Sequence, residues 1–254
     1  MDNNDREFKN RIIELADRAY KEGRYIYTNF LNPSEISKVH ELKKELSHVG
    51  FCCFGGMELS ERAVVCFGNE ELFGYEPYFP ITVIKIEPRM KKFAEVLSHR
   101  DILGALMNQG IERDTMGDIL IKDNVAYVFI LDTMADYIIE NITSVRHTPV
   151  KTSVCENTEE LKNLSPETKQ IDLIVSSNRC DAIISKIYNL SREQALVLFR
   201  EGKVFIDGRE STGNARPIKE GEIVSVRGYG KFRFIREGGT TKKERLYVSI
   251  EKYV

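Results

Sequence analysis

Apolar positions in residues 1–78 recur first at the spacing of a helix and then in short runs. The residues that recur at three- and four-residue intervals are Phe8, Ile12, Leu15, Ala16 and Ala19. They predict an amphipathic helix, and a second helix is expected to begin at residues 32–35, Asn-Pro-Ser-Glu, because proline is favoured in a first turn. The apolar runs 49–54 and 63–67 predict two strands. Residues 1–78 are therefore expected to form a small mixed α/β domain.

Residues 79–156 carry strand and helix patterns in a definite succession. The predicted elements are a strand at 81–86, a helix or helix pair at 91–109, strands at 118–121 and 126–131, a helix at 134–142 and a strand at 147–154. This β-α-β-β-α-β succession is that of the ferredoxin-like plan, which RNA-recognition modules of the RRM type also use. Residues 79–156 are therefore predicted to be a ferredoxin-like (RRM-like) RNA-binding domain.

Tyr127 and Phe129 lie two residues apart on one predicted strand, so their side chains share a face. In an RRM-type module such aromatics stack on bases, and together with Arg100 they make a candidate second RNA surface. Their neighbours lack the basic and glycine residues of the RRM signature, however. Packing in the core is therefore favoured for the two rings, and base stacking is the alternative.

Residues 170–254 are predicted to form two short helices followed by a small antiparallel sheet. The helices are expected at 178–189 and from Ser191 onward, where Ser191 and Gln194 fit a capping box. A turn is expected at Gly238-Gly239. The strands are predicted at 203–206, from 209 onward, and at 222–227, 231–236 and 245–250.

A polar connection is predicted at 157–169, and it contains the pair Ser165-Pro166. With this connection the chain is expected to be α+β and to hold three small domains, at 1–78, 79–156 and 170–254. A length of 254 residues leaves room for two or three domains of ordinary size.

Composition places the chain among ordinary globular proteins. Hydrophobic residues make up 42% of it and charged residues 30%, which is enough for cores and a hydrated surface. The sequence has no run of about 18 apolar residues that could span a bilayer, and its charged start has no signal-peptide core, so a cytoplasmic protein is expected. The five cysteines are odd in number and include no C-x-x-C pair, which predicts reduced core thiols.

The formal net charge of −2 conceals an uneven distribution. Residues 176–254 hold 16 Lys+Arg against 10 Asp+Glu, a net of +6, whereas residues 1–175 hold 21 against 29, a net of −8. A basic region of this kind suits the phosphate backbone of RNA. The alternative is a solvated charged face, but the excess charge coincides with a helix start and glycine turns, which favours RNA binding.

No motif in the sequence predicts an enzyme. The string His99-Arg100-Asp101 resembles part of the protein-kinase catalytic loop, but the rest of that pattern and a glycine-rich phosphate loop are missing. Asp101 is instead predicted to cap a helix over 102–108, in which Gly104 allows close packing, and Arg100 to be available to an RNA phosphate. The four histidines form no pair at metal-ligand spacing. Neither a cofactor nor a metal site is expected.

Basic residues of the C-terminal region come from both predicted helices and from the sheet. They are Arg179, Arg192, Arg200, Lys203, Arg209, Arg216, Arg227, Lys231, Arg233 and Arg236. A helix that begins at Ser191 would offer free N–H groups and its positive dipole end to a phosphate, with Arg192 beside them. Alternation along the strand places Lys231 and Arg233 on one face and the phenylalanines between and after them on the other.

Several motifs of this region follow one another in a recognisable order. They are R-C-D at 179–181, L-S-R-E-Q-A at 190–195, G-K-V at 202–204, D-G at 207–208, P-I at 217–218 and G-E-I-V at 221–224. The order resembles the S-four RNA-binding domain, named after the fourth protein of the small ribosomal subunit. Cys180, Asp207 and Glu222 depart from the usual Leu, Asn and Asp.

The resemblance to the S-four domain implies that RNA is bound across the helix pair and the adjoining hairpin. The residues that it assigns to RNA are Arg179, Ser191, Arg192, Arg200, Lys203 and Arg209. The basic strands beyond the hairpin add Arg227, Lys231 and Arg233 to this set of candidate RNA-binding residues.

Further segments extend the resemblance over nearly the whole chain. They are residues 97–106, Gly117-Asp118-Ile119, the pair Gly55-Gly56 near Glu61-Arg62-Ala63, and residues 227–234. With the C-terminal motifs they make the chain similar to the bacterial YlmH family. That resemblance implies a ribosome-associated, non-catalytic protein that contacts rRNA and tRNA on the large subunit and holds peptidyl-tRNA during ribosome-associated quality control of stalled translation.

Two other functions stay open beside this one. S-four domains also accompany pseudouridine synthases, so an RNA-modifying enzyme or its accessory is the main rival, although residues 1–156 show neither a nucleophilic aspartate motif nor a cofactor loop. Some YlmH proteins lie in cell-division gene neighbourhoods, which implies a cell-division scaffold as a third function. In each case a monomer without a small-molecule substrate and without a membrane span is expected.

Overall fold

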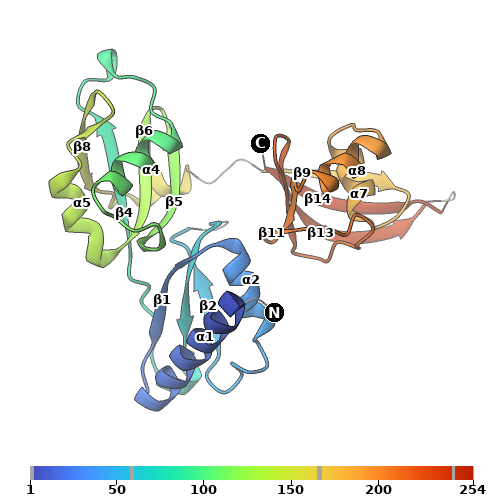
Figure 1. Ribbon diagram of the computed structural model, residues 1–254, viewed down its shortest axis with the longest axis horizontal. Helices are drawn as coiled ribbons and strands as arrows, with labels where there is room; N and C mark the ends of the chain where they lie inside the picture. The colour runs from blue at the N-terminus through green and yellow to red at the C-terminus, as the bar shows by residue number, and fades with distance from the viewer. Residues whose placement is uncertain (1–2, 58–59, 165–167, 242–243, 254) are drawn as a thin grey trace. The chain divides into compact units, whose positions relative to one another are not determined.

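The computed structural model describes residues 3–57, 60–164, 168–241 and 244–253 (Figure 1). Three antiparallel sheets and the helices packed on them make the protein α+β, as predicted. The chain divides into two compact units, Met1–Ser165 and Pro166–Val254. Ser165 and Pro166 of the predicted connection lie outside the described residues.

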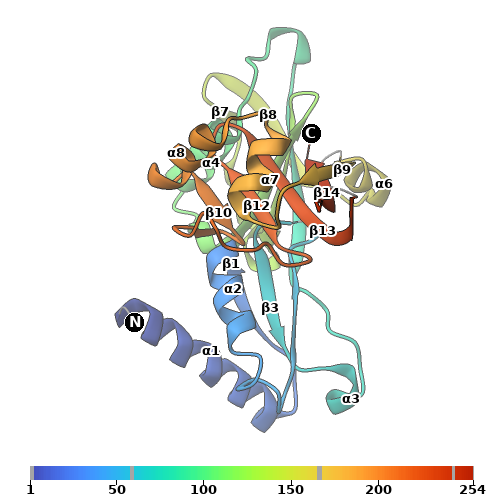
Figure 2. The same cartoon turned by 90° about the vertical axis from the view of Figure 1, so that its right-hand side faces the viewer.

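The first unit begins with a three-stranded sheet in the order β1-β3-β2. Its elements are α1 (Asn3–Glu22), β1 (Ile26–Leu31), α2 (Pro33–Glu41), β2 (Phe51–Phe54), β3 (Ala63–Phe67) and α3 (Glu70–Phe73). Figure 2 shows α1 and α2 beside the strands. Ile12, Ala16 and Val39 from the helices are buried in one cluster with Val65 and Phe67 of β3, so the helices cover one face of this sheet.

The helix start predicted at residues 32–35 is confirmed. Asn32 is the N-cap of α2, its side chain accepts the backbone N–H of Glu35, and the Glu35 side chain accepts the N–H of Asn32 in return. Strand β1, by contrast, has no counterpart in the sequence prediction. Its pairing with β3 shifts register between Tyr27 and Phe30, and such an irregularity interrupts the alternation by which a strand is recognised.

A five-stranded sheet in the order β5-β6-β4-β8-β7 follows in the first unit. Its elements are β4 (Ile81–Pro88), η1 (Lys91–Phe93), α4 (His99–Asn108), η2 (Arg113–Thr115), β5 (Met116–Lys122), β6 (Val125–Leu131), η3 (Asp132–Met134), α5 (Ala135–Asn141), β7 (Ser144–Val145), β8 (Thr148–Val154) and α6 (Thr158–Lys162). Ile102 and Ile138 from α4 and α5 are buried against Ile84 and Val128 of the sheet. The six main elements follow the predicted succession.

Helix α4 differs from its prediction at its start. The interval 91–109, predicted as a helix or a helix pair, holds the short helix η1 and then α4, and residues 94–98 between them are not helical. Ser98, and not Asp101, is the N-cap: its hydroxyl accepts the N–H of Asp101, whose carboxylate accepts the N–H of Ser98. The predicted close approach at Gly104 is also wrong, because a Cβ there would meet no described heavy atom within 4 Å.

The three-stranded and five-stranded sheets share a hydrophobic cluster, which makes the first unit continuous. Phe30 and Val64 from the former pack with Val83 and Phe129 from the latter. The approach is close at Gly117, where a Cβ would lie 2.6 Å from the ring of Phe30. A side chain at position 117 would therefore force the two sheets apart.

The second unit is a six-stranded sheet in the order β11-β10-β12-β13-β14-β9 with a helix pair on one face. Its elements are β9 (Thr168–Val175), α7 (Cys180–Ile187), α8 (Arg192–Arg200), β10 (Val204–Ile206), β11 (Arg209–Glu210), β12 (Ile223–Val226), β13 (Gly230–Thr240) and β14 (Leu246–Tyr253). Strand β9 was not expected, and the predicted turn at Gly238-Gly239 lies inside β13. In the described parts of both units, no helix combines the length and apolarity needed to cross a membrane.

Candidate nucleic-acid interface

Helix α8 starts as its sequence predicts. The Ser191 hydroxyl accepts the N–H of Gln194 at 3.1 Å, and the Gln194 side-chain oxygen accepts the N–H of Ser191 at 2.8 Å, which completes the capping box. Ala195, Leu198 and Phe199 bury the opposite side of the helix in the core. The helix therefore presents its first turn, including the exposed side chain of Arg192, to solvent.

A depression of about 280 Å³ lies at this end of the helix pair. It is lined by Ile174, Val175, Ser176, Ser177, Ala182, Ser185, Lys186, Arg192 and Arg245. Three exposed cations and three serines thus converge, and none of the described residues lining it carries a carboxylate. We call this depression, with Lys186, Arg192 and Arg245, the basic pocket.

Sheet pairing explains why Arg245 belongs to the basic pocket. Leu246 of β14 pairs with Val175 of β9, so Arg245 comes to lie next to the residues that lead from β9 into α7. Within the described part of the chain, the side chains of Lys186, Arg192 and Arg245 have no ion-pair partner. Their charge is therefore available to an anion, and the positive end of the α8 dipole adds to it.

Arg179, by contrast, is occupied inside the protein. Its guanidinium donates two hydrogen bonds to Asp181, at 3.0 and 2.7 Å, and the Asp181 side chain is 0% exposed. Burial alone would raise the pKa of Asp181, but hydrogen bonds from Arg179 and Asn214 outweigh it and lower that pKa. The same pairing raises the pKa of Arg179. Arg179 thus neutralises a buried carboxylate beside the start of α7.

Four further candidates lie outside the lining of the basic pocket. Arg200 is exposed in the last turn of α8, roughly 12 Å along the helix from Arg192. The Lys203 ammonium forms an ion pair with Glu201 at 2.7 Å. Arg227 lies over the ring of Phe205 at 4.4 Å, and its N–H donates to the Lys203 carbonyl. Arg209 opens β11 and is half-buried.

Lys231 and Arg233 point to the face of the sheet that the helices leave open. Phe232 and Phe234 between and after them are buried in the helix-side core, as the alternation predicts. Lys231 lies over Tyr253 at 4.6 Å, and Arg233 is 4.0 Å from Glu251. The nine predicted RNA-binding residues of the second unit therefore do not form one surface.

In the first unit the two aromatic candidates are covered. Tyr127 is 5% and Phe129 0% exposed, and they pack with Phe30 and Val64. Their rings are therefore closed to base stacking in this structure, and core packing describes them. Arg100, the third member of the candidate surface, is exposed near the start of α4.

The hydroxyl of Tyr127 is held by a polar cluster on the covered face of the sheet. It donates to the Glu160 carboxylate, which also pairs with Lys85 at 2.7 Å. The hydrogen bonds from Lys85 and then from Tyr127 lower the pKa of Glu160, and burial followed by the neighbouring carboxylate raises the pKa of Tyr127. The cluster fastens α6 to the sheet.

The described residues contain no group of three or more His, Cys, Asp or Glu that could hold a metal ion.

Comparison with known proteins gives these surfaces a context. A curated relative from Bacillus subtilis (strain 168), the ribosome-associated protein quality control protein P2, is 25% identical over 251 residues, which cover 98% of this chain and 95% of the relative. A solved structure, the cell division protein ylmH from Streptococcus pneumoniae, matches with a TM-score of 0.51 and 26% identity. The match covers 63% of this chain and 96% of that one.

Two family models match consecutive parts of the first unit. Residues 4–72 match the model described as "YlmH, N-terminal", and residues 76–159 match the model described as "Putative RNA-binding domain in YlmH". The two matched ranges together take up more than half of the chain, and each of the two relatives is matched over almost its full length. The protein therefore belongs to the YlmH family.

Proposed function

We propose that this protein is a non-catalytic RNA-binding factor that associates with the large ribosomal subunit and acts in ribosome-associated quality control of stalled translation. It contacts the backbone of rRNA and tRNA there. The name of the Bacillus subtilis relative and the description of the model that matches residues 76–159 both support this function. In this proposal the protein binds and positions RNA and performs no chemistry on it.

The observation that carries the proposal is the basic pocket. Three cations without a described ion-pair partner meet three serine hydroxyls and a helix start, and none of the described lining residues brings a negative charge. Such a site suits a phosphate group, because charge-assisted hydrogen bonds to phosphate are among the strongest that proteins make. Of the three cations in the pocket, only Arg192 belongs to the residues predicted from the sequence. In this proposal Lys186 and Arg245 join it as phosphate ligands.

Domain folds are part of the same proposal. The strand order β5-β6-β4-β8 with α4 and α5 on one face supports a ferredoxin-like domain within residues 79–156. Two helices, a hairpin and the sheet that follows them support an S-four domain within residues 170–254. With residues 1–78 these would be the three domains of the chain.

The test measures binding of the full-length protein to large subunits that carry peptidyl-tRNA. We compare the wild type with the triple variant Lys186→Ala, Arg192→Ala and Arg245→Ala. The variant is expected to bind roughly tenfold or more weakly, and the slope of log K against log salt should flatten by about one for each phosphate contact that is lost.

A matched control removes three charges of the same unit outside the pocket, Lys169→Ala, Lys219→Ala and Arg236→Ala, whose side chains are exposed. The control should bind like the wild type. Equal affinity of wild type and pocket variant would refute the pocket, and a wild type that binds neither subunits nor RNA would refute the function as a whole.

A second candidate is a cell-division scaffold, which the name of the Streptococcus pneumoniae structure favours. The two functions differ in their dependence on RNA. Protein partners recovered from lysate that has been treated with RNase would support the scaffold, whereas partners that are lost with the RNA would support the ribosomal function. Formation of pseudouridine in bulk rRNA by the purified protein would instead support the RNA-modifying enzyme.

A further inference from the structure

A second group of cations gathers where β4 ends beside the first residues of the antiparallel strand β8, in the part of the chain that matches the RNA-binding model. Residues 79–156 hold nine Lys+Arg and eleven Asp+Glu, so this region is not basic as a whole. Three of its cations, Arg89, Lys91 and Lys151, nevertheless line one open depression of about 630 Å³ together with Glu87 and Pro88. The positive charge is thus local, as a specific contact site requires.

Arg89 is held so that its end faces outward. Its N–H donates to the Pro149 carbonyl at 2.9 Å, and its side-chain Nε donates to the Val150 carbonyl at 3.1 Å. Among the described residues none accepts a hydrogen bond from its two Nη groups. The guanidinium is therefore oriented in advance, and its two outer nitrogens can meet the two oxygens of a phosphate.

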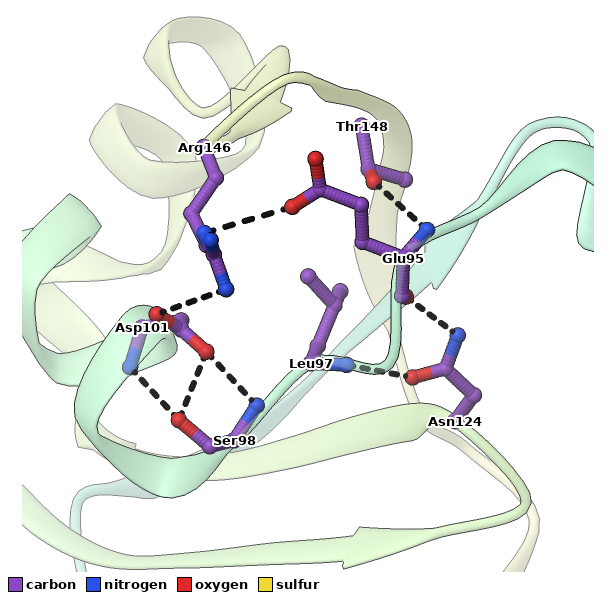
Figure 3. A network of polar contacts seen from close by, with 7 residues as sticks. All are labelled: Glu95, Leu97, Ser98, Asp101, Asn124, Arg146 and Thr148. Carbon is purple, nitrogen blue, oxygen red and sulfur yellow. Dashed lines mark hydrogen bonds and ion pairs between the residues drawn. The ribbon is translucent and has the colours of Figure 1, made fainter.

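The chain leaves the sheet at Arg89 and returns at residues 95–97, where a polar network fastens it (Figure 3). Asn124 makes two hydrogen bonds with the returning segment: its amide nitrogen donates to the Glu95 carbonyl at 2.9 Å, and its oxygen accepts the Leu97 N–H at 2.8 Å. The Thr148 hydroxyl accepts the Glu95 N–H at 3.2 Å, and the Glu95 carboxylate pairs with Arg146 at 3.2 Å.

The projecting segment is thus fixed at both ends. Lys91 lies between these anchors and is exposed, and Lys151 comes from the neighbouring strand β8. Neither has an ion-pair partner among the described residues. Figure 1 shows the segment between β4 and α4 extending beyond the sheet. A projecting segment that carries unpaired charge and is held by several hydrogen bonds loses little freedom when it binds.

The chemistry of the depression favours the backbone of a double-stranded RNA segment as its ligand. The described residues that line it include no aromatic ring, so a stacked single-stranded base finds no platform there. Double-stranded RNA is recognised mostly through its shape and its phosphates. The aromatic strand face of the same domain is covered, which removes the competing surface.

We propose that Arg89, Lys91 and Lys151 form a binding site for the phosphate backbone of double-stranded RNA. The site is distinct from the basic pocket, which lies in the other unit. This inference rests on the proposed RNA-binding function, and it assigns the RNA contact of residues 76–159 to the end of β4 and the beginning of β8.

The experiment uses the full-length protein and two RNA probes, a hairpin with a stem of about 20 base pairs and an unstructured single strand. It compares the wild type with the triple variant Arg89→Ala, Lys91→Ala and Lys151→Ala. A control variant, Lys21→Ala, Lys43→Ala and Lys44→Ala, removes the same charge from exposed positions elsewhere in the first unit. Circular dichroism and thermal unfolding verify that each variant is folded.

The site variant is expected to bind the hairpin about tenfold or more weakly than the wild type. Its slope of log K against log salt should be smaller by about three, which corresponds to about three lost phosphate contacts. The control variant should bind within about twofold of the wild type. Equal hairpin affinity of wild type and site variant overturns this inference while the proposed function stands. If the wild type itself binds no RNA, the proposed function fails. A loss confined to the single strand, or to a protein partner seated against the exposed Met90 and Val96, also overturns the inference.

Discussion

The carboxylate of Asp118 accepts the backbone N–H of Arg62 at 3.1 Å, and the guanidinium of Arg62 donates to the carbonyl of Met116, two residues before Asp118, at 2.9 Å. The same guanidinium also donates to the Phe30 carbonyl at 2.8 Å. Arg62 and Asp118 thus tie the three-stranded sheet to the five-stranded one. Both residues belong to segments that carry the resemblance to the YlmH family, and the structure gives these segments a shared structural role.

Replacing Arg62 should weaken the first unit. In Arg62→Ala the carbonyls of Phe30 and Arg113 lose the hydrogen bonds from this guanidinium, and the Met116 carbonyl keeps the side-chain hydrogen bond from Arg113. We expect the free energy of unfolding to fall by about 2–4 kcal/mol. Urea unfolding followed by circular dichroism measures the loss, and hydrogen exchange should locate it in β1, β3 and β5. Arg100→Ala, at an exposed position, is the control and should change stability by less than about 0.5 kcal/mol. An equal effect of both substitutions would contradict the role of Arg62.

Two glycine-to-alanine substitutions should change the stability of the first unit in opposite directions. At Gly117 the new Cβ would lie 2.6 Å from the ring of Phe30, so the two sheets must shift, at a cost of about 1–3 kcal/mol. At Gly104, inside α4, a Cβ meets no described atom within 4 Å, so alanine should stabilise the helix by about 0.5–1 kcal/mol. Thermal unfolding of the two variants distinguishes the cases, and destabilisation by Gly104→Ala would contradict the structure.

Aromatic character at positions 127 and 129 should matter for stability and not for RNA. If the rings stacked bases, Tyr127→Leu and Phe129→Leu would each weaken RNA binding by about 1–3 kcal/mol. Because both rings are buried in the shared core, we expect the folded variants to bind RNA like the wild type, and to unfold at a lower temperature. Titration with the single strand and the hairpin is the measurement. A clear loss of RNA affinity in a variant with a native circular dichroism spectrum would support base stacking as the role of these rings.

Cys52 should react faster than the other described cysteines. It is exposed, unlike the buried Cys66 and Cys180, so the expectation of core thiols is wrong for this residue. A hydrogen bond from Cys66 on the neighbouring strand lowers the pKa of Cys52 to about 7, whereas burial raises the pKa of Cys180 to about 12. Alkylation by iodoacetamide should therefore rise around pH 7 at Cys52, since the thiolate is the nucleophile.

Replacement of its partner provides the control. In Cys66→Ala the hydrogen bond to Cys52 is gone, so the midpoint of Cys52 alkylation should move upward toward the ordinary thiol value of about 8.5. Mass spectrometry of the digested protein follows both sites. A midpoint that stays in place in Cys66→Ala would show that the hydrogen bond is not the cause.

Elements with regular periodicity and a recognisable start were predictable from the sequence. The capping residues at Ser191 and Asn32 locate two helices because a cap is a local interaction that neighbouring residues decide. Strand β9 escaped prediction because its first residues, Thr168, Lys169 and Gln170, continue the polar character of the connection before it. Its partner β14 lies more than 70 residues away, and pairing at such a distance leaves no local signal.

The basic pocket shows the consequence for the site. Arg192 could be identified beside a helix start, but Arg245 reaches the pocket only because β14 pairs with the unpredicted β9. For Arg179 the sequence motif predicted an RNA contact, but in the structure its guanidinium is paired with Asp181. The burial of Asp181 is a property of the folded core and cannot be recognised from the motif. Charge along the chain thus indicates which region binds, and only the fold determines which charges remain available.

The Arg179–Asp181 pair also bears on how alanine scanning of this family should be interpreted. Arg179→Ala would leave a fully buried carboxylate with Asn214 as its remaining described side-chain partner, and an uncompensated buried charge of this kind costs roughly 3–5 kcal/mol. A binding assay on that variant would record a damaged scaffold as a lost contact. The double variant Arg179→Met with Asp181→Leu removes the cation together with the buried carboxylate that it neutralises. If that double variant binds RNA as tightly as the wild type, the role of Arg179 is structural and does not include an RNA contact.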